Sequence, residues 1–422
     1  MKIFFLIYIL VLVSTHDCFS QQKLTLEECK ELAKQNNYEM KKSVLSIQEA
    51  QHGKKNAFTK YFPSVQANGI GLKSNSGLLE TSIMGMDLSL IREGFYGGIS
   101  VTQPIFAGGQ IMNGNKLADK LVDIQKNQSE IVADEVELLT EQYYWQYIQL
   151  KEKLKTLEVI EELVGQTLKE VSASVKAGLI THNNELQVQL KLDEVKASKM
   201  ELYNNIDAVK MLLSQHIGII SDSIEITEVA FENAIHPNAF SVNSDAALHA
   251  NKTYNLLDKG IEVSKYQTQI EKGKLLPTVA VGANYFFENM VDRKHTVGMA
   301  FVSVSIPISG WWGGTHSVRQ KKINEKISEY NKIDAGEKII VQMKNYYKEL
   351  EVAYQQIQIA ESSVKNASEN LRLNNNYYKS GLITLNDLLD AQTLLQKAKD
   401  TLVDRHTRYL IKLSHYKKIT GQ

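Results

Sequence analysis

The chain has 422 residues, which is long enough for two or more ordinary domains. Lysine plus arginine and aspartate plus glutamate both number 48, so no basic excess points to nucleic acid or to an anionic membrane surface. Beyond the N-terminus, no apolar run is long enough for a membrane-spanning helix.

The N-terminus has the pattern of a secretory signal peptide. Lys2 precedes an apolar run over residues 3–13, and the small residues Cys18 and Ser20 stand at positions −3 and −1 of a cleavage site. We therefore predict a signal peptide over residues 1–20. An uncleaved anchor is the alternative, but the apolar run is short for one.

A helix is predicted over residues 24–61. Thr25 can cap its start, and Glu28 follows at the capping-box position. Phe62-Pro63-Ser64 ends the helix, because proline lacks the backbone donor and its ring clashes with a continuing helix.

Two alternating segments then predict a strand hairpin within residues 62–106. Val65 and Ala67 alternate with polar neighbours, and residues 99–103 alternate in the same way. Each strand has one apolar face and one small or polar face. The two strands are joined by a loop of about twenty residues.

A long helix and a returning helix follow. Residues 110–176 contain no proline, which predicts one helix of ~67 residues, and a second helix is predicted over residues 183–217. Apolar residues recur in both at four- and three-residue steps, so the two should pack as an antiparallel coiled coil. Each apolar seam has one charged interruption, at Glu161 and at Lys199. The seam positions are Leu150, Leu154, Leu157, Val164, Leu168, Val171 and Val175, then Leu192, Val195, Leu202, Ile206, Val209 and Leu213.

The whole pattern occurs twice. Lys-Ala-Gly-Leu-Ile-Thr at residues 176–181 returns as Lys-Ser-Gly-Leu-Ile-Thr at residues 379–384, a shift of 381 − 178 = 203. The same shift carries Pro104 onto Pro307 and the pair Tyr143-Tyr144 onto Tyr346-Tyr347. A constant offset over so long a span indicates a tandem duplication.

The duplication defines the predicted organisation of the chain. A signal peptide at 1–20 is followed by repeat 1 at 21–218, with strand hairpin 62–106 and tip 178–181. A linker at 219–243, with one short strand near 224–227, leads to repeat 2 at 244–422, with strand hairpin 277–307 and tip 381–384.

The strands leave two interpretations open. Four strands cannot close a barrel alone, but three copies give twelve, an even number within the range of outer-membrane barrels. A periplasmic sheet packed on helices fits the alternation equally well. Phe106, Trp311 and Trp312 suit an aromatic girdle at the membrane interface or plain packing. In a barrel, the lipid-facing residues would include Val281, Val302 and Val304, and the lumen-facing residues Gly282, Ser303 and Ser305.

No catalytic, cofactor or metal site is predicted. The ten histidines are scattered, and the chain lacks the His-Glu-x-x-His zinc motif, a phosphate loop and a Gly-x-Ser-x-Gly elbow. Only Cys29 would remain after cleavage, which excludes a disulfide framework and a cysteine metal cluster.

Several motifs carry a resemblance to a known family. They are the duplication, Phe-Pro-Ser at 62–64, Val-Thr-Gln-Pro-Ile-Phe at 101–106 before Gly108-Gly109, Gly-Leu-Ile-Thr at both tips, and Asp-Leu-Leu-Asp-Ala-Gln at 387–392. With these motifs the chain resembles the TolC-like outer-membrane efflux proteins (outer-membrane factors) over nearly its whole mature length.

The resemblance implies a fold of mixed α and β structure. Each protomer of a homotrimer would give four strands to a 12-stranded β-barrel and long antiparallel coiled-coil helices to a periplasmic α-helical tunnel. The implied function is a passive exit duct for efflux or type I secretion, gated at its tips, in the cell outer membrane and extending into the periplasm. Its implied partners are outer-membrane lipid, a periplasmic adaptor (membrane fusion) protein and an inner-membrane transporter. The alternative is a periplasmic coiled-coil protein that is not inserted in the membrane.

The resemblance also assigns roles to residues near the tips. Asp387 and Asp390 would form an acidic ring at the tunnel entrance, and Tyr378 a contact that closes the tip. Taken alone, an acidic pair three residues apart also fits a solvated helix face, and a tip glycine also fits a plain helix C-cap. The chain departs from the family at Ile383, where arginine is expected, and at Asn184 and Gln187, the repeat-1 equivalents of the acids. The implied adaptor contacts are Gly178, Leu179, Ile180, Thr181, Gly381, Leu382, Ile383 and Thr384.

Overall fold

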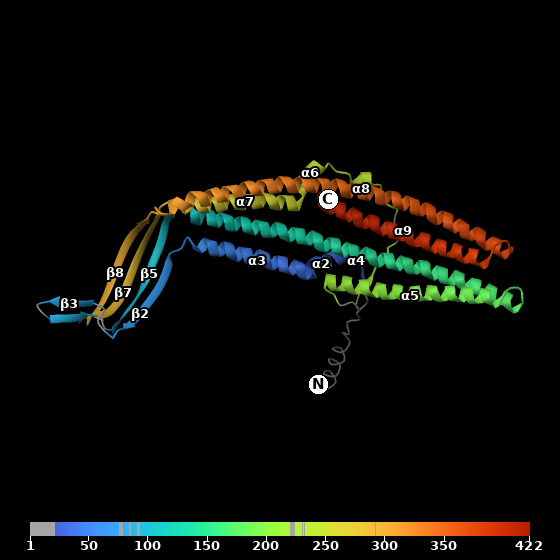
Figure 1. The fold of residues 1–422 in the computed structure, drawn as a ribbon, viewed down its shortest axis with the longest axis horizontal. Helices are drawn as coiled ribbons and strands as arrows, with labels where there is room; N and C mark the ends of the chain where they lie inside the picture. Colours follow the sequence, from blue (N-terminus) through green and yellow to red (C-terminus); the bar gives the residue numbers. More distant parts are fainter. Residues whose placement is uncertain are drawn as a thin grey trace, which may run out of the picture. The chain divides into compact units, whose positions relative to one another are not determined.

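The computed structural model describes residues 22–75, 79–83, 86–90, 93–219, 224–229, 231, 233–291 and 293–422. The predicted signal peptide therefore lies outside the described residues. The described chain forms two compact units, and each takes parts of both sequence repeats (Figure 1). Unit 1 holds the described residues up to Lys42, Glu130–Lys252 and Glu337–Gln422, and unit 2 holds Ser43–Ser129 and Thr253–Gly336.

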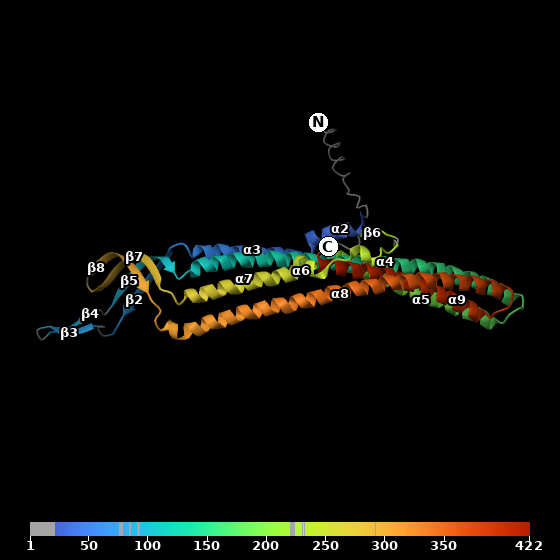
Figure 2. The same cartoon turned by 90° about the horizontal axis from the view of Figure 1, so that it is seen from above.

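Unit 1 is built on two antiparallel helix pairs. Helix α4 (Gln110–Lys176) turns into α5 (His182–Ile217), and α8 (Gly310–Lys379) turns into α9 (Leu385–Thr420). Both views show the members of each pair side by side down to their turn (Figures 1 and 2). Helices α4 and α8 have 67 and 70 residues, and each contributes to both units. The prediction of one unbroken helix over residues 110–176 is confirmed.

The predicted coiled-coil seam forms the core between α4 and α5. Its buried members are Leu154, Leu157, Val164 and Val171 on α4 and Val195, Leu202, Ile206, Val209 and Leu213 on α5, and Leu150, Leu168, Val175 and Leu192 pack against them. The two charged interruptions meet each other, because Lys199 Nζ donates to Glu161 Oε2 at 2.9 Å. Each half-buried charge therefore has its counter-charge, and Lys199 has a second carboxylate, that of Glu158, at 3.8 Å.

The prediction of one helix over residues 24–61 is wrong, because two helices lie there. Helix α2 (Leu26–Asn36) and helix α3 (Tyr38–Thr59) are separated at Asn37, which has a non-helical backbone (φ −59°, ψ 137°). The side-chain amide of Asn37 donates to the carbonyl oxygen of His216 at 2.9 Å. That carbonyl lies at the end of α5, where no partner exists within the helix. The break is thus stabilised by a contact 179 residues away in sequence. The predicted capping box of Thr25 and Glu28 is confirmed.

Repeat 2 has the same joint. Helix α6 (Ser244–Ala250) and helix α7 (Lys252–Gly273) are separated at Asn251, whose amide donates to the carbonyl oxygen of Ile419 at 2.9 Å. His216 and Ile419 are related by the repeat shift of 419 − 216 = 203. In both repeats, therefore, an asparagine between two helices donates its side-chain amide to a carbonyl at the C-terminal end of the returning helix, α5 or α9.

Protonation of His216 is expected to loosen the first joint. Its Nε2 donates to the carbonyl oxygen of Val136 at 3.1 Å, so its Nδ1 accepts from the Asn37 amide at 3.2 Å. Burial lowers the pKa of His216 below its usual value. The unfolded chain therefore binds this proton more tightly. The stabilisation is complete above a pH of about 6.5 and is lost as the pH falls through the lowered pKa of the folded state.

The measurement is the thermal denaturation midpoint at a pH of about 7.5 and of about 5.5. The control variant is His216→Ile, which copies Ile419 of repeat 2 and cannot titrate. The native protein should lose more stability on acidification than this variant. Equal losses would assign the acid sensitivity to His406 and His415, whose pKa values burial also lowers.

Unit 2 contains a four-stranded antiparallel sheet in the order β2-β5-β7-β8. Strands β2 (Ser64–Lys73) and β5 (Glu93–Ala107) come from repeat 1, and β7 (Thr278–Val291) and β8 (Arg293–Ser305) come from repeat 2. Because β5 pairs with β7, the two predicted hairpins join into one sheet. The region predicted as a plain loop contains a further antiparallel pair, β3 (Leu79–Ile83) and β4 (Met86–Leu90).

The linker contains the expected short strand. Strand β6 (Ile224–Ile226) pairs in parallel with β1 (Gln22–Leu24), and a 3-10 turn, η2, follows at Pro237–Phe240. Among the helices that the structure describes, none carries an apolar stretch that could cross a membrane.

Candidate functional site: the helical tips and the strand faces

The two tip turns have the same backbone geometry. Gly178 and Gly381 lie in the left-handed region with φ of 71° and 70°. The N–H of Gly178 donates to the carbonyl of Val175, and the N–H of Leu179 to that of Ser174, both at 2.9 Å. This is a Schellman turn, which satisfies the last carbonyls of the helix. A Cβ on either glycine would meet open space, so glycine is required by the backbone conformation and not by crowding.

Each tip presents one leucine to solvent. Leu179 is 77% exposed and Leu382 is 72% exposed, while the next residues, Ile180 and Ile383, are half-buried. Two equivalent apolar side chains thus stand free at the two tips, as a surface that a partner protein could cover.

The two returning helices start differently. In repeat 2, Thr384 and Asp387 form a capping box, in which the Thr384 N–H and hydroxyl donate to Asp387 Oδ2 at 2.8 and 2.7 Å. These hydrogen bonds hold the pKa of the Asp387 carboxyl below its usual value. In repeat 1, the Thr181 hydroxyl bonds to Asn184 Oδ1 at 2.9 Å, and Thr181 makes no side-chain cap. Asp387 therefore has a local structural role that the sequence analysis did not identify.

The other predicted entrance residues lie on the same part of the fold. Asp390 is exposed one turn beyond Asp387. Tyr378 is half-buried and packs against the core of unit 1. Burial, together with the nearby Glu170 carboxylate, raises its pKa. The single chain thus places both acids on the exposed face of α9, and their assembly into a ring stays a prediction.

A buried polar pair near the tips was missed by the sequence analysis. Gln392 is 3% exposed, and its Nε2 donates to Thr167 Oγ1 at 3.1 Å across α9 and α4. It borders a cavity of about 260 Å³ that α8 also lines through Arg372 and Lys379. Gln392 is the last residue of the Asp-Leu-Leu-Asp-Ala-Gln motif, and its place in that motif is the sequence feature that could have identified it.

The strand register defines two faces of the sheet. Val302 lies opposite Val281, and Ser303 lies opposite Ala280. Opposite residues share a face and successive residues alternate. Val281, Val302 and Val304 therefore lie on one face, and Gly282, Ser303 and Ser305 lie on the other. Val302 and Val304 are 72% and 61% exposed. The predicted placement of these two sets of residues on opposite faces of the sheet is confirmed. The contact of one face with lipid stays a prediction.

Comparison with known proteins agrees with this architecture. Residues 247–422 match the family model described as Outer membrane efflux protein. The outer membrane protein TolC of Salmonella enteritidis is 22% identical over 349 residues, which are 76% of this chain and 68% of TolC. The alkaline protease secretion protein AprF of Pseudomonas aeruginosa is 20% identical over 238 residues, or 54% of this chain. That match spans only half, 50%, of the length of AprF.

Solved structures extend the likeness over nearly the whole chain. The outer membrane protein VceC of Vibrio cholerae superposes with a TM-score of 0.78 at 14% identity, covering 94% of this chain and 96% of VceC. The CmeC outer membrane channel of Campylobacter jejuni superposes with a TM-score of 0.79 at 14% identity, covering 94% of this chain and 85% of CmeC. At such identities the superpositions establish the fold. Residues 247–422 thus match the model of the outer membrane efflux protein family, and the chain as a whole has the fold of the TolC-like outer-membrane channels.

Proposed function

We propose that this chain is the outer-membrane exit duct of a tripartite efflux or type I secretion system. Three copies would close a 12-stranded barrel in the outer membrane and a helical tunnel in the periplasm. The observation that carries the proposal is the two-faced sheet, whose apolar face is uncovered in the single chain at Val302 and Val304. Lipid around a closed barrel would cover this face and would leave no strand edge unpaired.

Two uncovered apolar stripes in unit 1 support the homotrimer. On α8, Val341, Val352, Ile359 and Tyr377 are exposed, at steps of 11, 7 and 18 residues that return to the same side of a helix. On α5, Leu186, Leu190, Met200 and Met211 are exposed. A neighbouring copy that packs its α5 against α8 would bury both stripes.

The partners follow from the same proposal. The exposed tips, residues 178–181 and 381–384, would contact a periplasmic adaptor protein that couples the duct to an inner-membrane transporter. The name of AprF refers to protease secretion and the family name to efflux, and the proposal covers both kinds of cargo. The chain would conduct its cargo without chemistry of its own and without a cofactor.

The test is fractionation of cells that express the full chain. We expect a heat-modifiable trimer band in the outer-membrane fraction. A soluble periplasmic protein that remains monomeric without heating would instead support the alternative, a periplasmic coiled-coil protein.

An acidic entrance should make the duct select cations. Three copies of Asp387 and Asp390 would place six carboxylates around the opening, and such rings concentrate cations. We expect Asp387→Asn plus Asp390→Asn to lower cation selectivity and to relieve block by multivalent cations in single-channel recordings. Asparagine keeps an acceptor for the Thr384 hydroxyl, as Asn184 does for the Thr181 hydroxyl in repeat 1.

The control for this prediction is Glu194→Gln, which removes an exposed acid from α5. It should leave selectivity unchanged. If the double asparagine variant also conducts like the native channel, the two acids form only a solvated helix face.

A further inference from the structure

The linker between the repeats belongs to unit 1 and contacts the long helices of that unit at two places. We call residues 224–229 foot 1 and residues 233–242 foot 2. Foot 1 contacts α4, which belongs to repeat 1, and foot 2 contacts α8 and α9, which belong to repeat 2. The linker therefore connects α4 of repeat 1 with α8 and α9 of repeat 2.

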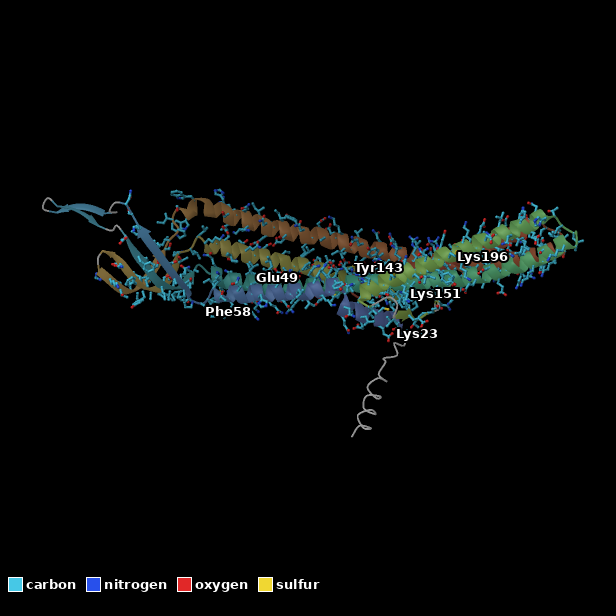
Figure 3. All side chains as sticks on the ribbon, turned by 90° about the horizontal axis from the view of Figure 1, so that it is seen from below. Lys23, Glu49, Phe58, Tyr143, Lys151 and Lys196 are labelled. Carbon is cyan, nitrogen blue, oxygen red and sulfur yellow. The ribbon has the colours of Figure 1, made fainter. Side chains whose placement is uncertain are left out.

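Foot 1 is held on α4 by one hydrogen bond and two ion pairs. The Tyr144 hydroxyl donates to the carbonyl oxygen of Thr227 at 3.0 Å. The Glu228 carboxylate accepts from Lys155 and from Lys151, which is labelled in Figure 3, both at 3.0 Å. These two lysines, Lys155 foremost, lower the pKa of Glu228, so the ion pairs persist at neutral pH.

Foot 2 is held mainly by tyrosine hydroxyls. Tyr347 on α8 donates to Asn238 Oδ1 at 3.0 Å, Tyr409 on α9 donates to the carbonyl of Ile235, and Tyr416 on α9 accepts from the N–H of Val242 at 3.3 Å. Tyr144, which contacts foot 1, and Tyr347, which contacts foot 2, are related by the repeat shift, 347 − 144 = 203. The duplicated tyrosine pair thus supplies one linker anchor in each repeat.

An aromatic stack joins the same two groups of helices. The ring of Phe231 lies between Trp145 of α4 and His406 of α9, with centroid distances of 6.3 and 5.2 Å and interplanar angles of 25° and 21°. A displacement of α9 along α4 would have to break this stack.

We propose that the linker is a strap that restrains the α8–α9 pair against α4 and thereby sets how readily the tips open. This inference rests on the proposed function, because only a gated duct needs that movement. Any shift of α8–α9 relative to α4 must strain foot 1, foot 2 or the Phe231 stack. Each hydrogen bond that must break disfavours the shifted state about fivefold.

The test compares two double variants that differ in which tyrosines lose their hydroxyls. Tyr144→Phe plus Tyr347→Phe removes one anchor from each foot. Tyr143→Phe plus Tyr346→Phe is the matched control, because among the described residues these hydroxyls make no hydrogen bond to the linker. Phe231→Ala, which removes the stack, is a third variant.

Two readouts separate the strap from the proposed function. The first is the open fraction of single channels of the full chain in planar bilayers. The second is the distance between spin labels on Ala177→Cys and Ser380→Cys, one on each tip, in protein in which one protomer is labelled. Cys29 is fully buried and stays unlabelled. The second readout does not depend on conduction.

We expect the anchor variant, which removes two hydrogen bonds, to raise the open fraction by up to about 25-fold. Phe231→Ala should also raise it, and both variants should broaden the distance distribution, while the control variant matches the native protein. Unchanged label distances in both variants, or equal broadening in the control, would overturn the strap. Native protein that forms no channel would overturn the proposed function, and the label distances would still decide the strap.

Discussion

Arginine in place of Val302 is expected to weaken barrel insertion by roughly 2–4 kcal/mol, and arginine in place of Ser303 to weaken it far less. Val302 is 72% exposed on the apolar face of the sheet, where a charge would enter hydrocarbon. Ser303 lies on the opposite face, which water would fill in a closed barrel. The measurement is the free energy of unfolding of each variant from lipid bilayers.

A labelling experiment checks the faces independently. Val302→Cys and Ser303→Cys are adjacent in sequence and differ only in the face that they occupy, so each is the control for the other. A membrane-impermeant thiol reagent should react faster at position 303 than at position 302. Faster reaction at position 302 would contradict the strand register or the barrel itself.

Valine at both tip glycines should block adaptor docking while the protein still assembles. Gly178 and Gly381 have φ of 71° and 70°, and a β-branched residue there strains the turn by roughly 1–3 kcal/mol. The strain would displace Leu179 and Leu382, which are the exposed side chains of the tips. Export by cells that carry Gly178→Val plus Gly381→Val is the measurement, and we expect it to be lost.

The matched control for the tips is Gly165→Val plus Gly260→Val. A Cβ on either of these glycines would also meet open space, but both lie within helices and have ordinary negative φ. Export should survive in the control variant. Full export by the tip variant would show that the tip turns are not needed for adaptor docking.

Regular elements were predictable because their signals are local. The absence of proline between residues 110 and 176 and the seam of Leu154, Leu157 and Val164 define one long helix, and the structure has that helix. The alternation around Val302 and Ser303 likewise gave the two faces of β8. In each case the repeat period of apolar residues is set by the geometry of a single element.

The helix break at Asn37 was not predictable in this way. Residues 24–61 have a continuous helical pattern, and the asparagine that interrupts it is satisfied by the carbonyl of His216, far along the chain. The partnership of Glu161 with Lys199 was equally hidden, since each appears alone as a defect in its own seam. Such features depend on which distant residues meet.

The tips show how the two kinds of information combine. The repeated Gly-Leu-Ile-Thr predicted both turns, and the resemblance assigned Asp387 and Asp390 to an entrance. The structure adds that Asp387 caps α9 through Thr384, which the matching position in repeat 1, Asn184, does not do for α5. Asparagine at position 387 would remove the charge of the acid and keep an acceptor for the Thr384 hydroxyl, which is why it is the informative substitution.

The sequence by itself determined the duplication, the long helices, the tip turns and the two faces of each strand, because each depends on residue type and spacing within one element. The tertiary structure decided the joints at Asn37 and Asn251, the pairing of β5 with β7, and the attachment of the linker through Tyr144 and Tyr347. These contacts join residues that are far apart in the chain. Their stability comes from satisfying buried polar groups of another element, and no local pattern records which element that is.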